Sequence, residues 1–134
     1  MATGTTTQTL VRNGGMTTVK FAWLASSGTG SMAAAVTESY ITNQIGGMFC
    51  ILGVTNPGDT TAPTDNYDIA VNDSFGCDIF GGELENRASG SVEQAVPKVG
   101  SGYMGRPISS ALSVALTGNS VASASGAIYL VFME

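Results

Sequence analysis

Histidine is absent from the chain, and charged side chains are scarce. Without an imidazole to act as acid or base near neutral pH, a Ser-His-Asp triad and a His-ligated metal are both excluded. Aspartate, glutamate, lysine and arginine make up 11% of the residues, less than half of the usual share of about 25%. Because so few charges give little protection against association, the composition favours either a polar extracellular chain or one that packs against copies of itself or other proteins.

The few charges are unevenly distributed. Ten acidic and five basic residues give a net charge of −5 at pH 7. Most of the acidic residues crowd into the middle of the chain: Asp59, Asp65, Asp68, Asp73, Asp78, Glu83, Glu85 and Glu93. Five bases are too few for a phosphate-binding footprint, so we expect no nucleic-acid partner. The acidic middle is either a solvated face or, together with the slightly basic flanks, a source of head-to-tail complementarity between subunits.

Cysteine and long apolar runs are also in short supply. The two cysteines, Cys50 and Cys77, each lie in an apolar segment. We expect two buried thiols in a protein made in the cytosol, with a disulfide between them as the alternative. The start of the chain lacks the features of a signal peptide and no apolar run reaches membrane-spanning length, so we expect no membrane partner. The small polar residues 1–8 predict a flexible N-terminal arm, followed by a single β-sandwich domain over residues 9–134.

In their place the chain is rich in glycine, threonine, serine, alanine and valine, a composition typical of short strands and tight turns. Alternating or continuous apolar patterns predict strands over residues 9–12, 16–26, 48–55, 67–71, 77–80, 92–96, 108–117 and 126–134. The apolar run at 128–133 is expected in the middle of a sheet. We expect residues 34–42 to be mostly extended, and the glycine-rich residues 100–107 to form a mobile or partner-ordered loop. The pattern predicts an all-β fold: a β-sandwich or jelly-roll-like barrel of 7–9 short antiparallel strands.

Residues 63–87 are the most informative stretch and predict a β-hairpin. Tyr67, Ile69 and Val71 alternate with small or polar residues, which is the pattern of a half-buried strand. Residues 72–76, Asn-Asp-Ser-Phe-Gly, supply turn chemistry, and residues 77–80 provide the returning strand.

The acidic residues of this hairpin suggest two alternatives to turn chemistry. Asp68 and Asp78 would face each other across the hairpin, where like charges repel unless a cation lies between them. The oxygen ligands on offer to calcium are those of Asp59, Asp65, Asp68, Asn72 and Asp73. A carboxylate pair is also what glycoside hydrolysis requires. No EF-hand spacing is present, so we expect structural turn chemistry, with no catalytic residue, no metal site and no cofactor. Arg87 is expected to form a local or intersubunit ion pair near Glu83 and Glu85.

The same region contains a distinctive series of residues: Ala62-Pro63-Thr64-Asp65-Asn66-Tyr67-Asp68-Ile69, then Asp73 and Gly76, then Asp78-Ile79-Phe80-Gly81-Gly82, then Asn86-Arg87. This series resembles a segment of small virion proteins of tailed bacteriophages. The resemblance extends through Glu93-Gln94-Ala95-Val96-Pro97 to the last two predicted strands. Phe75 and Cys77 depart from the polar or aliphatic residues expected at that turn.

The resemblance implies a structural protein with a small all-β fold, encoded among head and tail genes and without catalytic residues. We expect a capsid decoration (cement) protein that stabilises the head shell, made in the host cytoplasm and located in the virion. The expected partners are further copies of the chain, with a trimer favoured, and the major capsid protein or other virion proteins. A head–tail or tail-associated ring or collar subunit is the nearest alternative.

A module that binds carbohydrate or another host-surface ligand is a second alternative. Its aromatic contacts would come from Trp23, Tyr40, Tyr67 and Tyr103, which are scattered along the chain. Trp23 is expected to anchor the core, with an interface as the other reading. Only the acidic residues favour an enzyme, so we expect a protein without catalytic activity.

Overall fold

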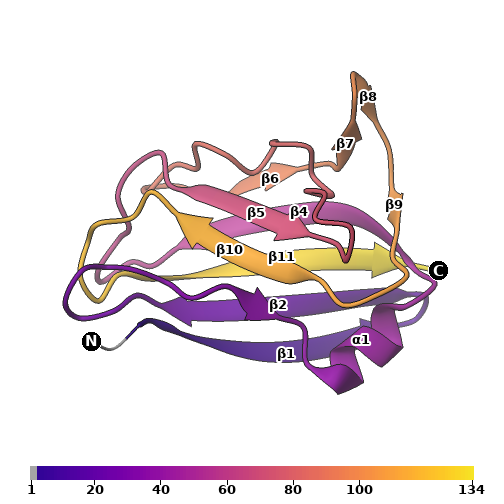
Figure 1. Cartoon of the computed structure of the whole chain (residues 1–134), viewed down its shortest axis with the longest axis horizontal. Coiled ribbons are helices and arrows are strands. Elements are labelled where there is room, and N and C mark those ends of the chain that lie inside the picture. The colour runs from indigo at the N-terminus through magenta and orange to yellow at the C-terminus, as the bar shows by residue number, and fades with distance from the viewer. Residues whose placement is uncertain (1–2) are drawn as a thin grey trace.

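A computed structural model describes residues 3–134, which form eleven strands and one short helix (Figure 1). All pairings between the named strands are antiparallel. The two main sheets lie face to face with a shared hydrophobic core between them. The chain is therefore an all-β, sandwich-type protein, which confirms the predicted fold class.

The larger sheet takes the strand order β1-β2-β11-β4-β6, and β9 pairs with the start of β4. Its members are β1 (Thr5–Asn13), β2 (Met16–Leu24), β4 (Phe49–Pro57), β6 (Glu93–Ala95), β9 (Arg106–Pro107) and β11 (Ser125–Met133). The C-terminal strand β11 lies between β2 and β4, which confirms the central position expected from its apolar sequence.

The smaller sheet takes the order β3-β10-β5. Its members are β3 (Ala35–Val36), β10 (Ser113–Thr117) and β5 (Asp68–Asn72). A separate two-stranded hairpin, β7 (Lys98–Val99) with β8 (Gly102–Tyr103), projects from the body of the sandwich (Figure 1). The helix α1 (Ser39–Ile45) lies at one end of the sandwich, near the turn that joins β1 to β2 (Figure 1).

Strand β11 has apolar side chains on both of its faces. Ile128, Leu130 and Phe132 are buried between the sheets. Side chains alternate along a strand, so Tyr129 and Val131 point to the outer face of the larger sheet, where they are only half-buried. The inner row fills the core, and the outer row leaves an apolar surface on the molecule.

Two aromatic contacts tie the sheets together across the core. The rings of Trp23, on β2, and Tyr67, just before β5, have centroids 6.2 Å apart and are tilted by 56°, a geometry that aromatic pairs favour. Trp23 is buried, which confirms its expected role as a core anchor. Phe80, also buried, lies directly against Gly53 of β4, because a Cβ placed on Gly53 would be 2.7 Å from the Phe80 ring.

The side chain of Gln8 joins the two sheets along one edge of the sandwich. Its Nε2 donates to the carbonyl oxygen of Val36 at 2.8 Å, and its Oε1 accepts from the Glu38 backbone at 2.9 Å. The hydroxyl of Tyr40 donates to the Gln8 carbonyl oxygen at 3.4 Å. These contacts cover part of an edge strand that would otherwise offer unpaired backbone groups to solvent.

The extended conformation expected for residues 34–42 is wrong from Ser39 onward, where α1 begins. Ile41 and Ile45 are four residues apart, so they share one face of the helix, and both are fully buried. Burial of this pair stabilises a helix too short to form alone in water. Across the described part of the chain, no helix has the length and apolarity needed to cross a bilayer.

The hairpin predicted over residues 63–87 is only half correct. β5 forms, but it pairs with β10, and the expected returning strand at 77–80 is replaced by a series of turns. These turns still follow β5: Ile79 donates to the Val71 carbonyl oxygen at 2.8 Å, and Ile69 donates to that of Leu84 at 2.9 Å. Residues 108–112 also differ from the prediction, because β10 begins only at Ser113.

Residues 5–8, expected in a flexible arm, belong to β1 and pair with β2 in register. Their threonines have the β-branched side chains that favour strands. Residues 1–2 of the expected arm lie outside the described residues.

The contact between Phe80 and Gly53 predicts a specific cost of adding one methyl group. Gly53→Ala is expected to lower the free energy of unfolding by about 1–3 kcal/mol, because the buried Phe80 ring has no space to move. Urea unfolding measures this change. Gly15→Ala is the matched control, since a Cβ there meets nothing within 4 Å. Equal unfolding midpoints for the two variants would contradict the predicted packing.

Candidate functional site

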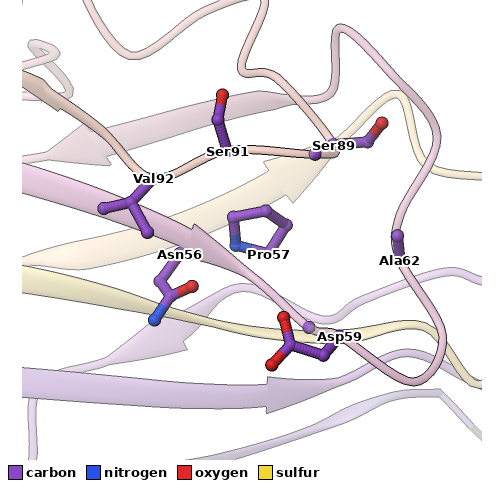
Figure 2. Close-up of a pocket in the computed structure, with 9 residues that line it drawn as sticks. Asn56, Pro57, Asp59, Ala62, Ser89, Ser91 and Val92 are labelled. Carbon is purple, nitrogen blue, oxygen red and sulfur yellow. The ribbon is translucent and has the colours of Figure 1, made fainter.

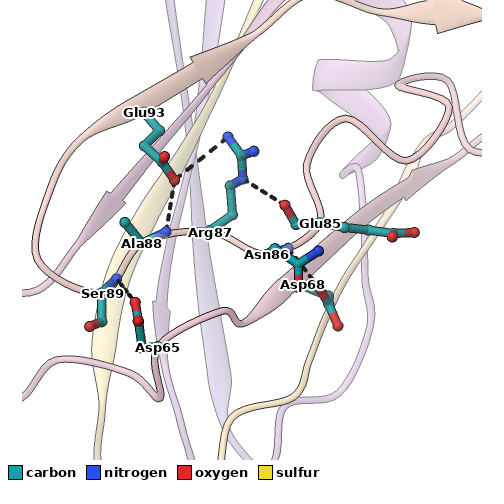
Figure 3. Close-up of polar contacts among 8 residues, drawn as sticks. All are labelled: Asp65, Asp68, Glu85, Asn86, Arg87, Ala88, Ser89 and Glu93. Atoms are coloured by element: carbon teal, nitrogen blue, oxygen red, sulfur yellow. Dashed lines mark hydrogen bonds and ion pairs between the residues drawn. The ribbon is translucent and has the colours of Figure 1, made fainter.

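The acidic residues near β5 bind backbone amides of their own loops (Figure 3). Asp65 Oδ1 accepts from the Ser89 backbone at 3.0 Å, and Asp68 Oδ1 accepts from the Asn86 backbone at 2.9 Å. These bonds fasten the segment that follows the turns to the start of β5. The two carboxylates therefore fasten distant segments, whereas the local turn chemistry expected from the sequence is found at Asp73, whose Oδ1 accepts from the backbones of Phe75 and Cys77.

Arg87 pairs with a different carboxylate from those expected. Its Nη1 is 3.8 Å from Glu93 Oε1, and that oxygen also accepts from the Ala88 backbone at 2.7 Å (Figure 3). Toward Glu85 it makes only a bond to the backbone, with Nε 3.2 Å from the carbonyl oxygen. The sequence could not show this, because Arg87 is placed by its bridge with Tyr67 and Glu93 by the pairing of β6 with β4.

Asp78 is the most heavily used carboxylate in this region. Oδ1 accepts from Val71 at 3.2 Å and from Phe80 at 3.1 Å, while Oδ2 accepts from Gly82 at 2.9 Å. Asp78 forms an isolated bridge with Asn72 and does not lie opposite Asp68 as expected. The repulsion between two facing carboxylates, which suggested a bound cation, is therefore not part of the fold. Among residues 3–134, no three or more Cys, Asp or Glu side chains gather in a way that could hold a metal ion.

One hollow of about 370 Å³ lies between the end of β4 and residues 89–92 (Figure 2). Asp59 is the one ionisable residue among those that line it, and Ser89 and Ser91 contribute the hydroxyls. Acid–base catalysis by paired carboxylates needs a second acidic group across the cleft, and this lining does not supply one. The hollow therefore offers a few hydrogen-bonding groups but no catalytic pair.

The outer face of the larger sheet is an open, nearly uncharged surface. Nothing in the described chain packs over it (Figure 1). Lys20 is the one charged residue that its strands contribute, and its Nζ lies 5.6 Å from the centre of the Tyr129 ring on the same face. Asp59, on the loop after β4, lines a shallow hollow beside Lys20 and Tyr129. The register places the following side chains on this face beside them: Thr5, Thr7, Thr9, Val11, Asn13, Met16, Thr18, Ala22, Leu24, Phe49, Leu52, Val54, Asn56, Gln94, Ser125, Ala127, Val131 and Met133. We call this the outer face.

The most apolar part of the outer face is a row across one end of the sheet. Met16, Met133 and Phe49 are direct partners in the register, and Pro107 of β9 continues the row beside Phe49. All four are exposed. Contiguous exposed apolar residues of this kind are typical of protein–protein contact sites.

The β7–β8 hairpin adds a second exposed apolar element, with Val99 and Tyr103 on its strands. Its base is held by Glu83, whose Oε1 is 3.2 Å from Lys98 Nζ and 3.4 Å from the Tyr103 hydroxyl. An isolated two-stranded hairpin is marginal in water, so these contacts keep the element in place. The sequence prediction of a glycine-rich loop at 100–107 missed this hairpin.

The two cysteines differ in environment, and the expectation of two buried thiols is wrong for one of them. Cys50 is buried on β4, and burial raises the pKa of its thiol to about 12. Cys77 is exposed, as are the three residues before it, Ser74, Phe75 and Gly76. Both are free thiols.

The aromatic residues considered for carbohydrate binding do not form a shared platform. Trp23 and Tyr67 are buried in the core. Tyr40 on α1 and Tyr103 on β8 are exposed, but they belong to separate elements of the fold. A stacking surface for a sugar ring is therefore not assembled from these four residues.

In comparisons with known proteins, no family model, no curated protein and no solved structure matches the chain. Its function is therefore argued from its own surfaces. The outer face is the surface most relevant to function. In the sequence it was visible as the uninterrupted apolar run of β11, which puts apolar side chains on both sides of the strand.

The contacts of Asp78 predict that this carboxylate supports the fold. Asp78→Ala is expected to lower the free energy of unfolding by about 2 kcal/mol, because three backbone amides lose a charged acceptor. Glu85→Ala, in the same acidic stretch, is the control and is expected to change stability by less than about 0.5 kcal/mol. Thermal or urea unfolding measures both. A similar stability loss in the two variants would show that Asp78 has no special structural role.

Proposed function

We propose that the chain is a structural protein of a tailed-bacteriophage virion, specifically a capsid decoration (cement) protein on the outside of the head shell. In this proposal it acts as a homo-oligomer, with a trimer favoured, and it contacts the major capsid protein. The single observation that carries the proposal is the outer face, where one lysine is the only charge across five strands.

The uncharged composition of the outer face suits a protein whose function is to bind other proteins through that face. Subunit contacts bury apolar and uncharged groups more favourably than charged ones, and the outer face offers mainly threonine, valine, leucine and methionine. A cement protein benefits from such a surface, because the free energy of its binding to the repeating shell comes only from the contact itself. The residues that resemble phage virion proteins, from Ala62 to Arg87, form β5 and the loops fastened to it.

A head–tail or collar ring subunit would use the same kind of surface, so the two roles are separated by where the protein is found on a particle. Cryo-electron microscopy of purified virions is the direct experiment. Density for the chain on the head surface supports the proposal, and density at the neck or tail supports the ring subunit instead. Absence of the chain from purified particles would overturn both roles.

A substitution on the outer face tests whether that surface makes the contact. Thr18→Glu places a carboxylate in the middle of the outer face without changing the core, so we expect the protein to stay folded. Binding to particles that lack the protein is expected to weaken by at least about tenfold, because desolvating the added carboxylate is costly even with Lys20 nearby.

Ser27→Glu, on the exposed loop after β2, is the charge-matched control and is expected to bind normally. Circular dichroism checks that both variants are folded. Unchanged binding of a folded Thr18→Glu variant would show that the outer face is not the contact surface.

A further inference from the structure

The turn that follows β5 presents a phenylalanine to solvent. Phe75 is 82% exposed, the largest value among the exposed large hydrophobic side chains of the described chain. A side chain of this size is normally buried, since removing its apolar surface from water stabilises a protein or a complex. Phe75 is therefore available for contact with a partner outside the monomer.

The backbone of this turn is firmly held, so Phe75 is presented in a fixed position. Asp73 Oδ1 accepts from the backbones of Phe75 at 2.9 Å and Cys77 at 3.0 Å. The Asp73 backbone also donates to the Cys77 carbonyl oxygen at 3.0 Å. Gly76 has a φ of 79°, a conformation that glycine adopts without strain. A rigid aromatic side chain loses little conformational entropy on binding, which suits it to anchor an interface.

A hollow of about 360 Å³ lies beside this turn. It is lined by Asp73, Phe75, Cys77, Arg106, Pro107, Ile108, Ser109, Ser110 and Leu112, and most of its exposed lining is apolar. Its volume falls within the range of about 300–1,000 Å³ typical of pockets for small organic groups, so a benzyl side chain fits. Phe75 stands at the rim of this hollow and, being exposed, does not fill it.

The charges around the hollow are complementary to each other. Asp73 lies on the turn that carries Phe75, and Arg106 lies on β9, which also lines the hollow. Within residues 3–134, Arg106 has no ion-pair partner, whereas the other arginines pair with Glu134 and Glu93. A surface that holds an apolar knob, an apolar hollow, one acid and one base is complementary to a second copy of itself, which is the property of contacts between identical subunits.

We infer that this chain associates with itself by inserting Phe75 of one copy into the 106–112 hollow of another, with Asp73 of the first copy facing Arg106 of the second. Phe75 and the hollow lie side by side on one surface. The contact is therefore compatible with a reciprocal two-fold pair and with a closed ring. This contact is a specific form of the homo-oligomer in the proposed function. It rests on the proposal that the chain forms a homo-oligomer, and it does not rest on the proposed location in a virion. It meets the apolar row of the outer face at Pro107, and the rest of that face stays open to a different partner.

Sedimentation velocity of the purified protein over a range of concentrations tests this contact. The wild type is expected to self-associate, and Phe75→Ser is expected to weaken the association by at least about 30-fold, as for an aromatic anchor at an interface. Val11→Ser, which removes a side chain that is 65% exposed on the outer face, is the matched control and is expected to associate normally. Because Phe75 makes no core contact, its variant is expected to keep the wild-type melting temperature.

Cys77 provides a second readout in the same hollow. Cys50 is buried, so a maleimide added to the native protein reports on Cys77 alone. Labelling of Cys77 is expected to slow as the wild-type concentration rises, and to show no concentration dependence in Phe75→Ser. A double-mutant cycle with Asp73→Asn, which keeps the turn acceptor, and Arg106→Gln is expected to show that the two charges are coupled.

The outcomes separate this contact from the virion role. A monomer at every concentration, equal weakening by Phe75→Ser and Val11→Ser, or Cys77 labelling that ignores concentration would each overturn the self-association contact. None of these results depends on phage particles. Absence from virions, in turn, would overturn the proposed function and leave the Phe75 contact standing.

Discussion

The structure depends on one strand that is apolar on both sides. β11 pairs with β2 and β4 along its whole length, and its inner side chains, Ile128, Leu130 and Phe132, hold the core. Its outer side chains are nearly as apolar, so the strand that stabilises the sandwich also makes its outer face poor in charge. A sheet that faces water on one side normally alternates apolar and polar residues. This sheet does so only through threonine and asparagine, and that departure underlies the proposed role as a protein covered by its neighbours.

The few acidic residues of this charge-poor chain have a structural role in its loops. In a chain with so few ionisable groups, carboxylates at Asp65, Asp68, Asp73 and Asp78 serve as acceptors for backbone amides in loops that have no regular pairing. Such acceptors let the long connection between β5 and β6 stay ordered with little regular secondary structure. Its order allows Phe80 to pack on Gly53 and allows Phe75 to be held at the surface.

The sequence predicted features that repeat along a strand and missed those that depend on a single contact. The period-2 pattern of β2 and the continuous run of β11 identified the fold class because burial there is averaged over many residues. The helix α1 escaped prediction because it is defined by one buried pair, Ile41 and Ile45. Cys77 was expected in the core, yet the turn fixed by Asp73 carries it outward. The partner of Arg87 was missed because the approach of Glu93 depends on two separate pairings, that of Arg87 with Tyr67 and that of β6 with β4.

The central claim is that the outer face of the larger sheet is covered when the protein does its work. Oxidative footprinting of Met16, Met133 and Phe49, in the protein alone and in purified phage particles, tests it most directly, since all three side chains are exposed in the monomer. The account predicts rapid oxidation of these residues in the free protein and strong protection in the particle. Equal oxidation in the two states would contradict it.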